Sequence, residues 1–223
     1  MTAVIELRDV VKTFDSEPPV EVLKGASLAV AQGEIACVMG VSGKGKSTLL
    51  HVAGGLIMPN SGSVVYGGEN LCAANQARID QLHAQGIGFI LQTPYLFQAL
   101  TVRENLVYAR KMSGAKPGET DLEAELSCFG LLDRADHMPY ELSVGQKRRL
   151  VIARALRGGH RLILADEPTN DLDATWSDYL FERLKGFAED GGTVIVVTHD
   201  RHYAGKADSL YALDNGKLVR QEA

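Results

Sequence analysis

The chain has 223 residues, of which 45% are hydrophobic, and it carries 23 lysines and arginines against 28 aspartates and glutamates. This length favours one large α/β domain, or one domain with a subdomain, over two independent domains. The net charge of −5 argues against non-specific nucleic-acid binding as the main task, although it allows a local basic patch.

Three cysteines, Cys37, Cys72 and Cys128, have neither C-x-x-C spacing nor clustered histidines, so we expect neither a zinc site nor a disulfide framework. Cys37 falls in an apolar run and is expected to be a small core residue. Residues 1–9 carry charges where a signal peptide needs an apolar centre. No run of about 18 to 20 apolar residues occurs, so the sequence predicts no membrane span and favours an intracellular, reducing compartment.

The amino-terminal part is predicted to form two strands, 4–14 and 21–30, which make an antiparallel start to the fold. Residues 16–19, with two prolines, form the expected connection between them. Phe14 lies just before this break, where its ring could stack on a purine. The alternative is an ordinary core phenylalanine, and its position is compatible with both.

A phosphate-binding loop is predicted directly after the apolar run 35–39. Residues 40–48 match the G-x-x-x-x-G-K-[ST] pattern, and a helix over 47–54 follows, as that pattern requires. The backbone N–H groups of such a loop form a nest for phosphate oxygens, and the helix adds the positive end of its dipole. Lys46 is expected to reach the terminal phosphates, and Ser47 is expected to ligate Mg²⁺. The residues predicted to bind ATP here are Gly40, Ser42, Gly43, Lys44, Gly45, Lys46, Ser47 and Thr48.

Short strands and one helix follow, with strands predicted at 63–66 and 86–91 and a helix at 76–84. The second of these strands ends at Gln92. From residue 102 to about 156, helical spacing dominates and strand-like runs vanish. We therefore expect a single domain, 1–223, in which a helical subdomain, 93–157, is inserted into an α/β core formed by 1–92 and 158–223.

The last part of the chain continues the α/β pattern. A helix begins after Ser143, a suitable N-cap residue, and has one basic and one apolar side. The continuous apolar run 161–165 predicts a strand in the middle of a parallel sheet. It delivers Asp166 and Glu167 at its carboxyl end, where ligands bind in open α/β sheets. The remaining predicted elements are a helix at 173–188, a buried strand at 193–198 that ends at His199, and a hairpin at 210–219 around an Asn-Gly turn.

The polar residues at the predicted strand ends supply what hydrolysis of a nucleoside triphosphate needs. Asp166 is placed to hold Mg²⁺ directly or through water, and Glu167 to orient and deprotonate the attacking water, worth roughly 10²- to 10⁴-fold in rate. Gln92 could touch the metal and the water, and His199 could donate to the γ-phosphate. Each has a plainer alternative as a solvated polar residue at the end of a strand. The phosphate loop in the same chain favours the catalytic interpretation.

The five residues Leu142, Ser143, Val144, Gly145 and Gln146 resemble the Leu-Ser-Gly-Gly-Gln signature of ATP-binding-cassette ATPases. They precede the acidic strand, as in that family, and the match covers essentially the whole chain. The motifs that carry it are Phe14, the phosphate loop, Gln92, the signature, Asp166 with Glu167, the so-called D-loop pair Leu172 and Asp173, and His199. The resemblance implies an α/β P-loop ATPase fold with a mainly parallel core sheet, an antiparallel amino-terminal subdomain and an inserted helical subdomain.

The same resemblance implies that the chain works with a second copy of itself. Members of the family pair head to tail and hold ATP between the phosphate loop of one subunit and the signature of the other. Ser143 and Gly145 would then meet the γ-phosphate bound by the partner, at a helix N-terminus. Closure on ATP and opening after hydrolysis would drive an integral membrane permease through Gln92 and the helical subdomain.

Within the family, residues 48–56, followed by Pro59 and by Ser61 with Gly62, are similar to the ATPases of lipoprotein-releasing and macrolide-export transporters. This similarity implies an ATP- and Mg²⁺-dependent subunit, cytoplasmic and peripheral on the inner face of the cell membrane, that drives export or extraction of a lipid-linked, peptide or drug-like cargo. The alternative is a non-transport ATPase that regulates a cell-division or cell-envelope complex through a membrane partner. A soluble nucleic-acid factor is disfavoured by the net charge and by the single cassette.

A few positions depart from the family's pattern. Lys44 stands where a small residue is usual. It could add positive charge near the phosphates or crowd the dimer partner, but we expect it to point to solvent because only its backbone N–H is needed there. Val144 replaces the first signature glycine and must take helical or extended angles, since a β-branched residue with positive φ is strained. Asn170 with Asp171 is closer to the translation-factor branch, and Phe14 stands where tyrosine is common.

Overall fold

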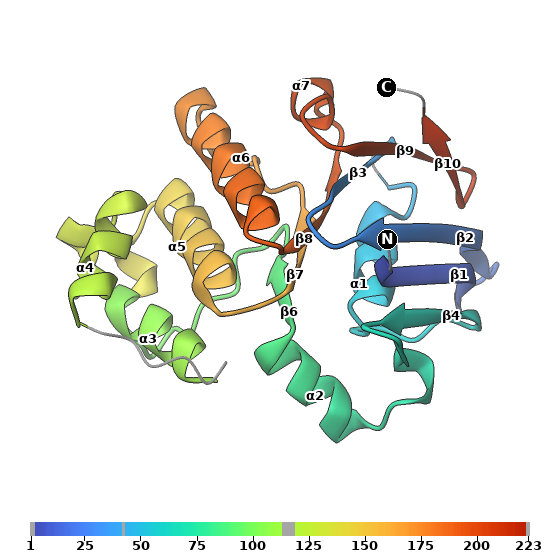
Figure 1. The fold of residues 1–223 in the computed structure, drawn as a ribbon, viewed down its shortest axis with the longest axis horizontal. Coiled ribbons are helices and arrows are strands. Elements are labelled where there is room, and N and C mark those ends of the chain that lie inside the picture. The colour runs from blue at the N-terminus through green and yellow to red at the C-terminus, as the bar shows by residue number, and fades with distance from the viewer. Residues whose placement is uncertain (1–2, 42, 113–118, 222–223) are drawn as a thin grey trace.

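Two sheets and a layer of helices make up the chain, which the computed structural model describes over residues 3–41, 43–112 and 119–221 (Figure 1). The strands are β1 (Ala3–Phe14), β2 (Val20–Ala31), β3 (Ile35–Met39), β4 (Ser61–Tyr66), β5 (Glu69–Asn70), β6 (Ile87–Ile90), β7 (Leu162–Asp166), β8 (Thr193–Thr198), β9 (Ser209–Asp214) and β10 (Lys217–Gln221). The α-helices are α1 (Lys46–Ala53), α2 (Gln76–Gln85), α3 (Val102–Met112), α4 (Glu119–Cys128), α5 (Val144–Arg157), α6 (Ala174–Glu189) and α7 (Arg201–Ala204). Short 3₁₀ helices occupy Leu71–Ala73, Leu132–Arg134 and Pro139–Glu141.

The central sheet has the strand order β10-β9-β3-β8-β7-β6. All neighbouring pairs are parallel except β9 and β10, which form the predicted hairpin. Asn215 and Gly216 at its turn both have positive φ, the conformation that a two-residue hairpin turn of this kind needs. The mainly parallel core sheet is thus confirmed, and the hairpin belongs to it because β9 pairs with β3.

Alternating side chains of β3, β7 and β8 face opposite sides of the central sheet, and both sides are buried. Leu164 and Ile195 belong to a core with α1 and the antiparallel sheet, whereas Ile163 and Val194 belong to a core with helices α3 to α6. A strand covered on both faces needs apolar residues at nearly every position, which explains the continuous apolar runs in the sequence. The central strands therefore separate two hydrophobic cores.

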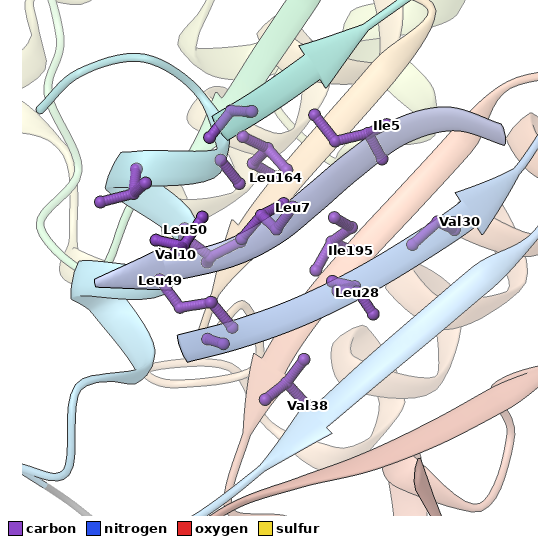
Figure 2. Close-up of a cluster of buried hydrophobic side chains, with 14 of the residues drawn as sticks. Ile5, Leu7, Val10, Leu28, Val30, Val38, Leu49, Leu50, Leu164 and Ile195 are labelled. Atoms are coloured by element: carbon purple, nitrogen blue, oxygen red, sulfur yellow. The ribbon is translucent and has the colours of Figure 1, made fainter. Parts of the chain in front are cut away.

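The amino-terminal strands form an antiparallel sheet of order β2-β1-β4-β5, in which the predicted pairing of the first two strands is present. Its inward side chains, including Ile5, Leu7 and Val30, share a core with Leu49 and Leu50 of α1 (Figure 2). Helix α1 contacts β1, β2, β7 and β8 and so lies between the two sheets. The loop that opens α1 is thereby held at the junction of both sheets.

Helices α3, α4 and α5 follow one another in the chain between β6 and β7, and they lie on the opposite side of the molecule from the antiparallel sheet (Figure 1). No strand occurs among the described residues between Ile90 and Leu162. Apolar side chains at helical spacing, such as Leu106, Leu126 and Leu150, are buried together. This arrangement is compatible with an inserted helical subdomain, while its boundaries at 93 and 157 stay a prediction.

Short elements are where the sequence patterns and the structure differ. The patterns do not predict β5 or α7, because 2 and 4 residues are too few to show a period. The predicted strand 63–66 begins earlier, at Ser61, and the predicted helix 47–54 runs over Lys46–Ala53. Within 3–41, 43–112 and 119–221, no helix is long and apolar enough to cross a membrane.

His160 lies in the turn between α5 and β7 and packs into space left by two glycines. A Cβ atom on Gly88 would come within 2.6 Å of the imidazole ring, and one on Gly158 within 2.4 Å. The Nδ1 atom of His160 is buried and has no hydrogen-bond partner among the described residues. Burial, assisted by the charge of Arg154, lowers the pKa of His160 to about 4, so the folded chain keeps this ring neutral at neutral pH.

We expect His160 to make the fold sensitive to acid. An unfolded histidine has a pKa of 6.5, so between pH 6.5 and about 4 the unfolded state takes up the proton first. Stability should therefore fall with pH over this window, by up to about 1.4 kcal/mol per pH unit. The variant His160→Gln removes the titration and should flatten the fall of Tm with pH, measured by thermal unfolding beside the wild-type chain. An unchanged pH dependence would contradict the buried, neutral state of the ring.

Candidate functional site

The predicted catalytic residues gather at one edge of the central sheet. Strands β3, β8, β7 and β6 are parallel neighbours, so their carboxyl ends meet at the same edge. The phosphate loop follows β3, His199 follows β8, Glu167 follows β7, and Gln92 lies beyond β6. A cavity of about 580 Å³ opens there, lined by Val22, Gly43, Gly45, Lys46, Ser47, Thr48, Gln92, Asp166, Glu167, Asn170 and His199.

The phosphate loop needs glycine for two physical reasons. Gly43 and Gly45 have φ of 76° and 98°, which a residue with a Cβ atom rarely adopts. A Cβ atom on Gly45 would also lie 2.5 Å from Cγ1 of Val22. Helix α1 starts directly after Gly45 without a side-chain cap from any described residue, so its first amide groups are available to a ligand. Ser42, which we predict to take part, lies outside the described residues.

Lys46 is buried and folds back across the loop that precedes it. Its ammonium group donates a hydrogen bond of 2.7 Å to the carbonyl oxygen of Gly40. The same group lies 3.5 Å from Oε1 of Glu167. The cation is therefore already shared between the phosphate loop and the acidic strand end. Lys44, by contrast, is exposed, in agreement with its expected orientation toward solvent.

Glu167 is held in a strained backbone conformation by a set of polar contacts. Its φ of 45° is uncommon for a residue with a side chain, and such strain is found at functional sites. Its Oε2 atom accepts hydrogen bonds from the Thr198 hydroxyl at 3.0 Å and from the His199 backbone N–H at 3.3 Å. Nδ1 of His199 lies 3.0 Å from the same oxygen. Together with Lys46 at Oε1, these contacts give both carboxylate oxygens a polar partner.

Asp166, the last residue of β7, is only 3% exposed. Burial raises the pKa of its carboxyl above the usual value, while a hydrogen bond from Ser47 acts in the opposite direction. A hydroxyl and a carboxylate are thus side by side in the cavity, and both carry oxygen ligands of the kind that Mg²⁺ prefers. Gln92, an exposed residue that lines the same cavity, adds an amide oxygen.

All five signature residues are described, and none of them lines this cavity. Ser143 is exposed and caps α5, because its hydroxyl accepts a hydrogen bond of 3.2 Å from the Gln146 N–H and its own N–H donates one of 2.8 Å to the Gln146 side chain. Leu142 is buried. Val144 is exposed and begins the helix, so it has the ordinary angles expected of it. The chain presents this signature as a separate element at its surface.

The predicted D-loop pair lies close to the signature of the same chain. Asp173 is the N-cap of α6 and accepts a hydrogen bond of 2.9 Å from the Trp176 N–H. The half-buried Leu172 packs against the core that contains α5. Gly145 comes so near the preceding turn that a Cβ atom on it would lie 3.1 Å from the carbonyl oxygen of Asp171. A larger residue at the signature glycine would push against this turn.

Phe14, the residue predicted to stack on a purine, is 42% exposed at the end of β1. This exposure argues against its being an ordinary core phenylalanine. The ammonium group of Lys12 lies 5.4 Å from the centre of its ring, a distance compatible with a cation–π contact. Its role toward a purine stays a prediction.

Sequence reasoning missed several residues at this edge of the sheet. Thr198 binds Glu167, and its place at the end of a buried strand beside His199 is a signal that could have found it. Val22 reaches the cavity from the antiparallel sheet, and Asn170 reaches it from the turn after Glu167. Val22 belongs to no motif, and Asn170 stands in the sequence only as a departure from the family's pattern, so the packing of the two sheets and of that turn is what places both residues in the cavity.

The comparison of this sequence with known proteins agrees with the geometry. A sequence profile described as ABC transporter matches residues 23–170. The lipoprotein-releasing system ATP-binding protein LolD of Geobacter metallireducens is 39% identical, with 98% of this chain and 99% of that protein covered. The macrolide export ATP-binding/permease protein MacB of Wolinella succinogenes is 38% identical over 98% of this chain. The chain spans about a third, 34%, of the length of that second relative.

Solved structures give the same result for the fold. The dimeric structure of MJ0796, a bacterial ABC transporter cassette, matches with a TM-score of 0.90 and 34% identity, over 98% of this chain and 97% of that one. A dimeric post-hydrolysis state of the same cassette, bound to ADP and Pi, matches with the same values. The expected cassette fold is thus confirmed. Sequence profile, full-length relative and solved structures together show that this chain belongs to the ABC transporter family and has the fold of its ATP-binding cassettes.

Proposed function

We propose that this chain binds and hydrolyses ATP as the nucleotide-binding subunit of a membrane transporter. The observation that carries the proposal is the single cavity where a buried cation, a hydroxyl, two acids, an amide and an imidazole meet a glycine-rich loop. Such a loop at a helix N-terminus suits a polyphosphate, and the acids suit the metal and the water that its hydrolysis needs.

ATP binding would exchange the internal partners of Lys46 for phosphate oxygens. Its ammonium group now pairs with Gly40 and Glu167, and the terminal phosphates carry more negative charge than either. The exchange keeps Lys46 paired while it releases Oε1 of Glu167. The amide groups of the loop and the dipole of α1 would bind the remaining phosphate oxygens, and the exposed ring of Phe14 would stack on the purine.

Ser47, Asp166 and Gln92 would hold Mg²⁺ in this cavity. The fit rests on their chemistry, because a hydroxyl, a carboxylate and an amide oxygen line one space and the buried carboxylate gains a compensating charge when a cation is present. When bound, the ion would neutralise charge on the phosphate oxygens. Asp166 keeps the Ser47 hydroxyl in place through their hydrogen bond.

Glu167 would act as the base that accepts a proton from the attacking water. The water oxygen forms a bond to the γ-phosphorus while the bond from that phosphorus to the ADP oxygen breaks, which yields ADP and phosphate. His199 would move from Oε2 of Glu167 to donate to an oxygen of the γ-phosphate as its charge grows. Thr198 would then hold the carboxylate of Glu167 in its strained position.

A second copy of the chain would complete this site. The signature begins α5 at an exposed surface away from the cavity, so Ser143 and the N-terminal amides of α5 would bind the γ-phosphate held by the partner. The partner's signature would in turn bind the γ-phosphate held by the first copy, so a head-to-tail pair has two equal sites. The dimers formed by the similar cassette MJ0796 support this arrangement.

An integral membrane permease would bind the groove between the α/β part and helix α3. This groove, of about 400 Å³, is lined by apolar and aromatic side chains that include Phe89, Phe97, Tyr108 and Met112. Phe97, Tyr108 and Met112 are 45%, 40% and 50% exposed, and exposed apolar grooves of this kind receive helices of partner proteins. Arg154 of α5 lines the same groove, so a helix bound there would touch the helix that carries the signature.

The permease would select the cargo. Similarity of this chain to LolD and MacB favours export or extraction of a lipid-linked, peptide or drug-like molecule. LolD, a lipoprotein-releasing ATP-binding protein, matches the chain over nearly its full length, and MacB, a macrolide export protein, matches it over one third of that protein. The subunit would lie on the inner face of the cell membrane through its permease.

Replacement of Asp166 by asparagine should stabilise the nucleotide-free chain. The carboxyl pKa is raised on folding, so stability falls as pH rises from 3.8 through the folded pKa and stays lower at neutral pH. The variant Asp166→Asn removes this loss and should raise Tm at pH 7 by about 2–4 °C for each kcal/mol recovered, while it weakens Mg²⁺-dependent ATP binding. The matched control is Asp178→Asn, at an exposed acid whose pKa is lowered by Lys206, and it should not raise Tm. A lower Tm for Asp166→Asn would refute the idea.

Replacement of Glu167 by glutamine should keep ATP binding and abolish turnover. The amide can accept hydrogen bonds but cannot take a proton from water, so we expect hydrolysis to fall by roughly 10²- to 10⁴-fold and the ATP-bound dimer to accumulate. Phosphate release and sedimentation measure both effects. Glu182→Gln, on the exposed side of α6, is the control and should hydrolyse ATP normally. Hydrolysis at the normal rate by Glu167→Gln would mean that another group is the base.

The transport part of the proposal is tested by isolation of the Glu167→Gln variant from detergent-solubilised membranes with ATP and Mg²⁺. We expect an integral membrane permease to copurify, and Tyr108→Asp in the groove to reduce its recovery, because a charge there would be buried by the bound helix. Vesicles that contain the permease with the wild-type chain should then move cargo when ATP is added, and vesicles with the Glu167→Gln chain should not. Recovery of only a signalling or cell-wall hydrolase complex would instead support the regulatory alternative.

A further inference from the structure

Arg148 of α5 is fully buried and bonds to two separate loops at the catalytic edge. Its guanidinium group donates hydrogen bonds to the carbonyl oxygens of Leu91 at 2.6 Å, Gln92 at 2.8 Å and Asn170 at 3.2 Å. Its Nη2 atom also lies 3.8 Å from a carboxylate oxygen of Asp171. Burial lowers the pKa of Arg148 and the nearby acids Asp171 and Asp166 raise it, but an arginine side chain in a protein stays charged. A charged donor therefore serves three backbone acceptors at once.

These acceptors lie just beyond the carboxyl ends of two neighbouring strands. Leu91 and Gln92 follow β6, and Gln92 is the candidate metal ligand and a wall of the nucleotide cavity. Asn170 follows β7, lines the same cavity and stands ahead of the D-loop pair. Helix α5 contacts β6 and α3 and lies between α4 and the central strands (Figure 1). One side chain of the signature helix thus joins it to both loops.

The chain after Gln92 is also bound by side chains of the helices α3 and α5. Arg154, which also lies on α5 and follows Arg148 in the chain, donates a hydrogen bond of 2.8 Å to the carbonyl oxygen of Tyr95. Asn105 of α3 binds both backbone polar groups of Phe97. Its side chain accepts a hydrogen bond of 3.0 Å from the Phe97 N–H and donates one of 3.1 Å to the Phe97 carbonyl oxygen. The segment 91–97 is therefore fastened to α3 and α5 at its start, middle and end.

We propose that Arg148 is a positioning residue that fastens the signature helix to Gln92 and to the turn before the D-loop, so that these three elements move together. A shift of the segment 91–97, whose Phe97 lines the groove proposed for the permease, would then reach the signature through Arg148. The role in coupling rests on the proposed function, whereas the clamp itself is made by contacts within one chain. Loss of the guanidinium would leave three backbone carbonyls without their charged donor.

The test compares Arg148→Gln and Arg148→Lys with Arg157→Gln, all in the Glu167→Gln chain. Arg157 lies on the same helix, near Glu125, and none of its described contacts involves the two loops. Hydrogen exchange in 91–97 and 169–172, ATP binding by the monomer and ATP-dependent dimerisation are measured. For Arg148→Gln we expect exchange in both segments to become at least about tenfold faster and dimerisation at least about tenfold weaker, with monomer affinity for ATP within about twofold. Arg148→Lys keeps the charge, so it should restore part of the protection from exchange and part of the dimerisation. The recovery should be partial because an ammonium group reaches fewer carbonyls than a guanidinium group.

Unchanged exchange and dimerisation in Arg148→Gln would overturn the proposal, as would equal effects in Arg157→Gln. If Arg148→Gln does not fold, Arg148→Lys decides the question, and exchange in the two segments at the parental rate would overturn it. If no chain dimerises with ATP, the proposed function fails. Exchange in the two segments still decides the clamp in that case, because it needs no partner and no hydrolysis.

Discussion

The parallel alignment of β3, β8, β7 and β6 is the constraint on which the candidate site depends. Because their carboxyl ends coincide, loops that are far apart in the sequence open into one cavity. The alignment is itself held by burial on both faces, where Ile195 and Val194 of β8 belong to different cores. Loss of packing in β8 would shift the phosphate loop relative to Glu167, although no apolar residue of that strand takes part in the chemistry.

Within the cavity, the charged groups bind one another in the nucleotide-free chain. Glu167 receives Lys46 at one oxygen and Thr198 with His199 at the other. In the proposed mechanism Lys46 and His199 bind the phosphates. Nucleotide would therefore take these two residues away from Glu167 and leave its carboxylate free to accept a proton from water. Ser143 differs from these cavity residues in its partners. Its described side-chain and N–H hydrogen bonds join it only to Gln146 in the first turn of α5, and its side chain is exposed to solvent. An exposed Ser143 of this kind is free to contact a nucleotide bound in the cavity of a second copy.

Local patterns in the sequence predicted the core and the position of most site residues, for a physical reason. Strands buried on both faces read as continuous apolar runs, and polar residues that end such runs, such as Glu167 and His199, must lie at the sheet edge. The contacts among them depend on the strand order and on the positive φ at Glu167, which no local pattern contains. Arg148 stands beside Arg149 in the sequence as one more basic residue of a helix, and its burial follows only from the packing of α5 against the loop at Leu91. The subdomain boundaries and the roles of the site residues remain predictions.

The claim that two copies share each site is tested most directly by mixing two inactive variants, Lys46→Ala and Ser143→Arg. In a head-to-tail pair, one site of a mixed dimer carries both defects and the other carries neither. Random pairing makes half of the dimers mixed, so hydrolysis should return to at most about one quarter of the normal rate. Absence of any recovery, with both variants shown to fold and to form mixed dimers, would contradict a shared site.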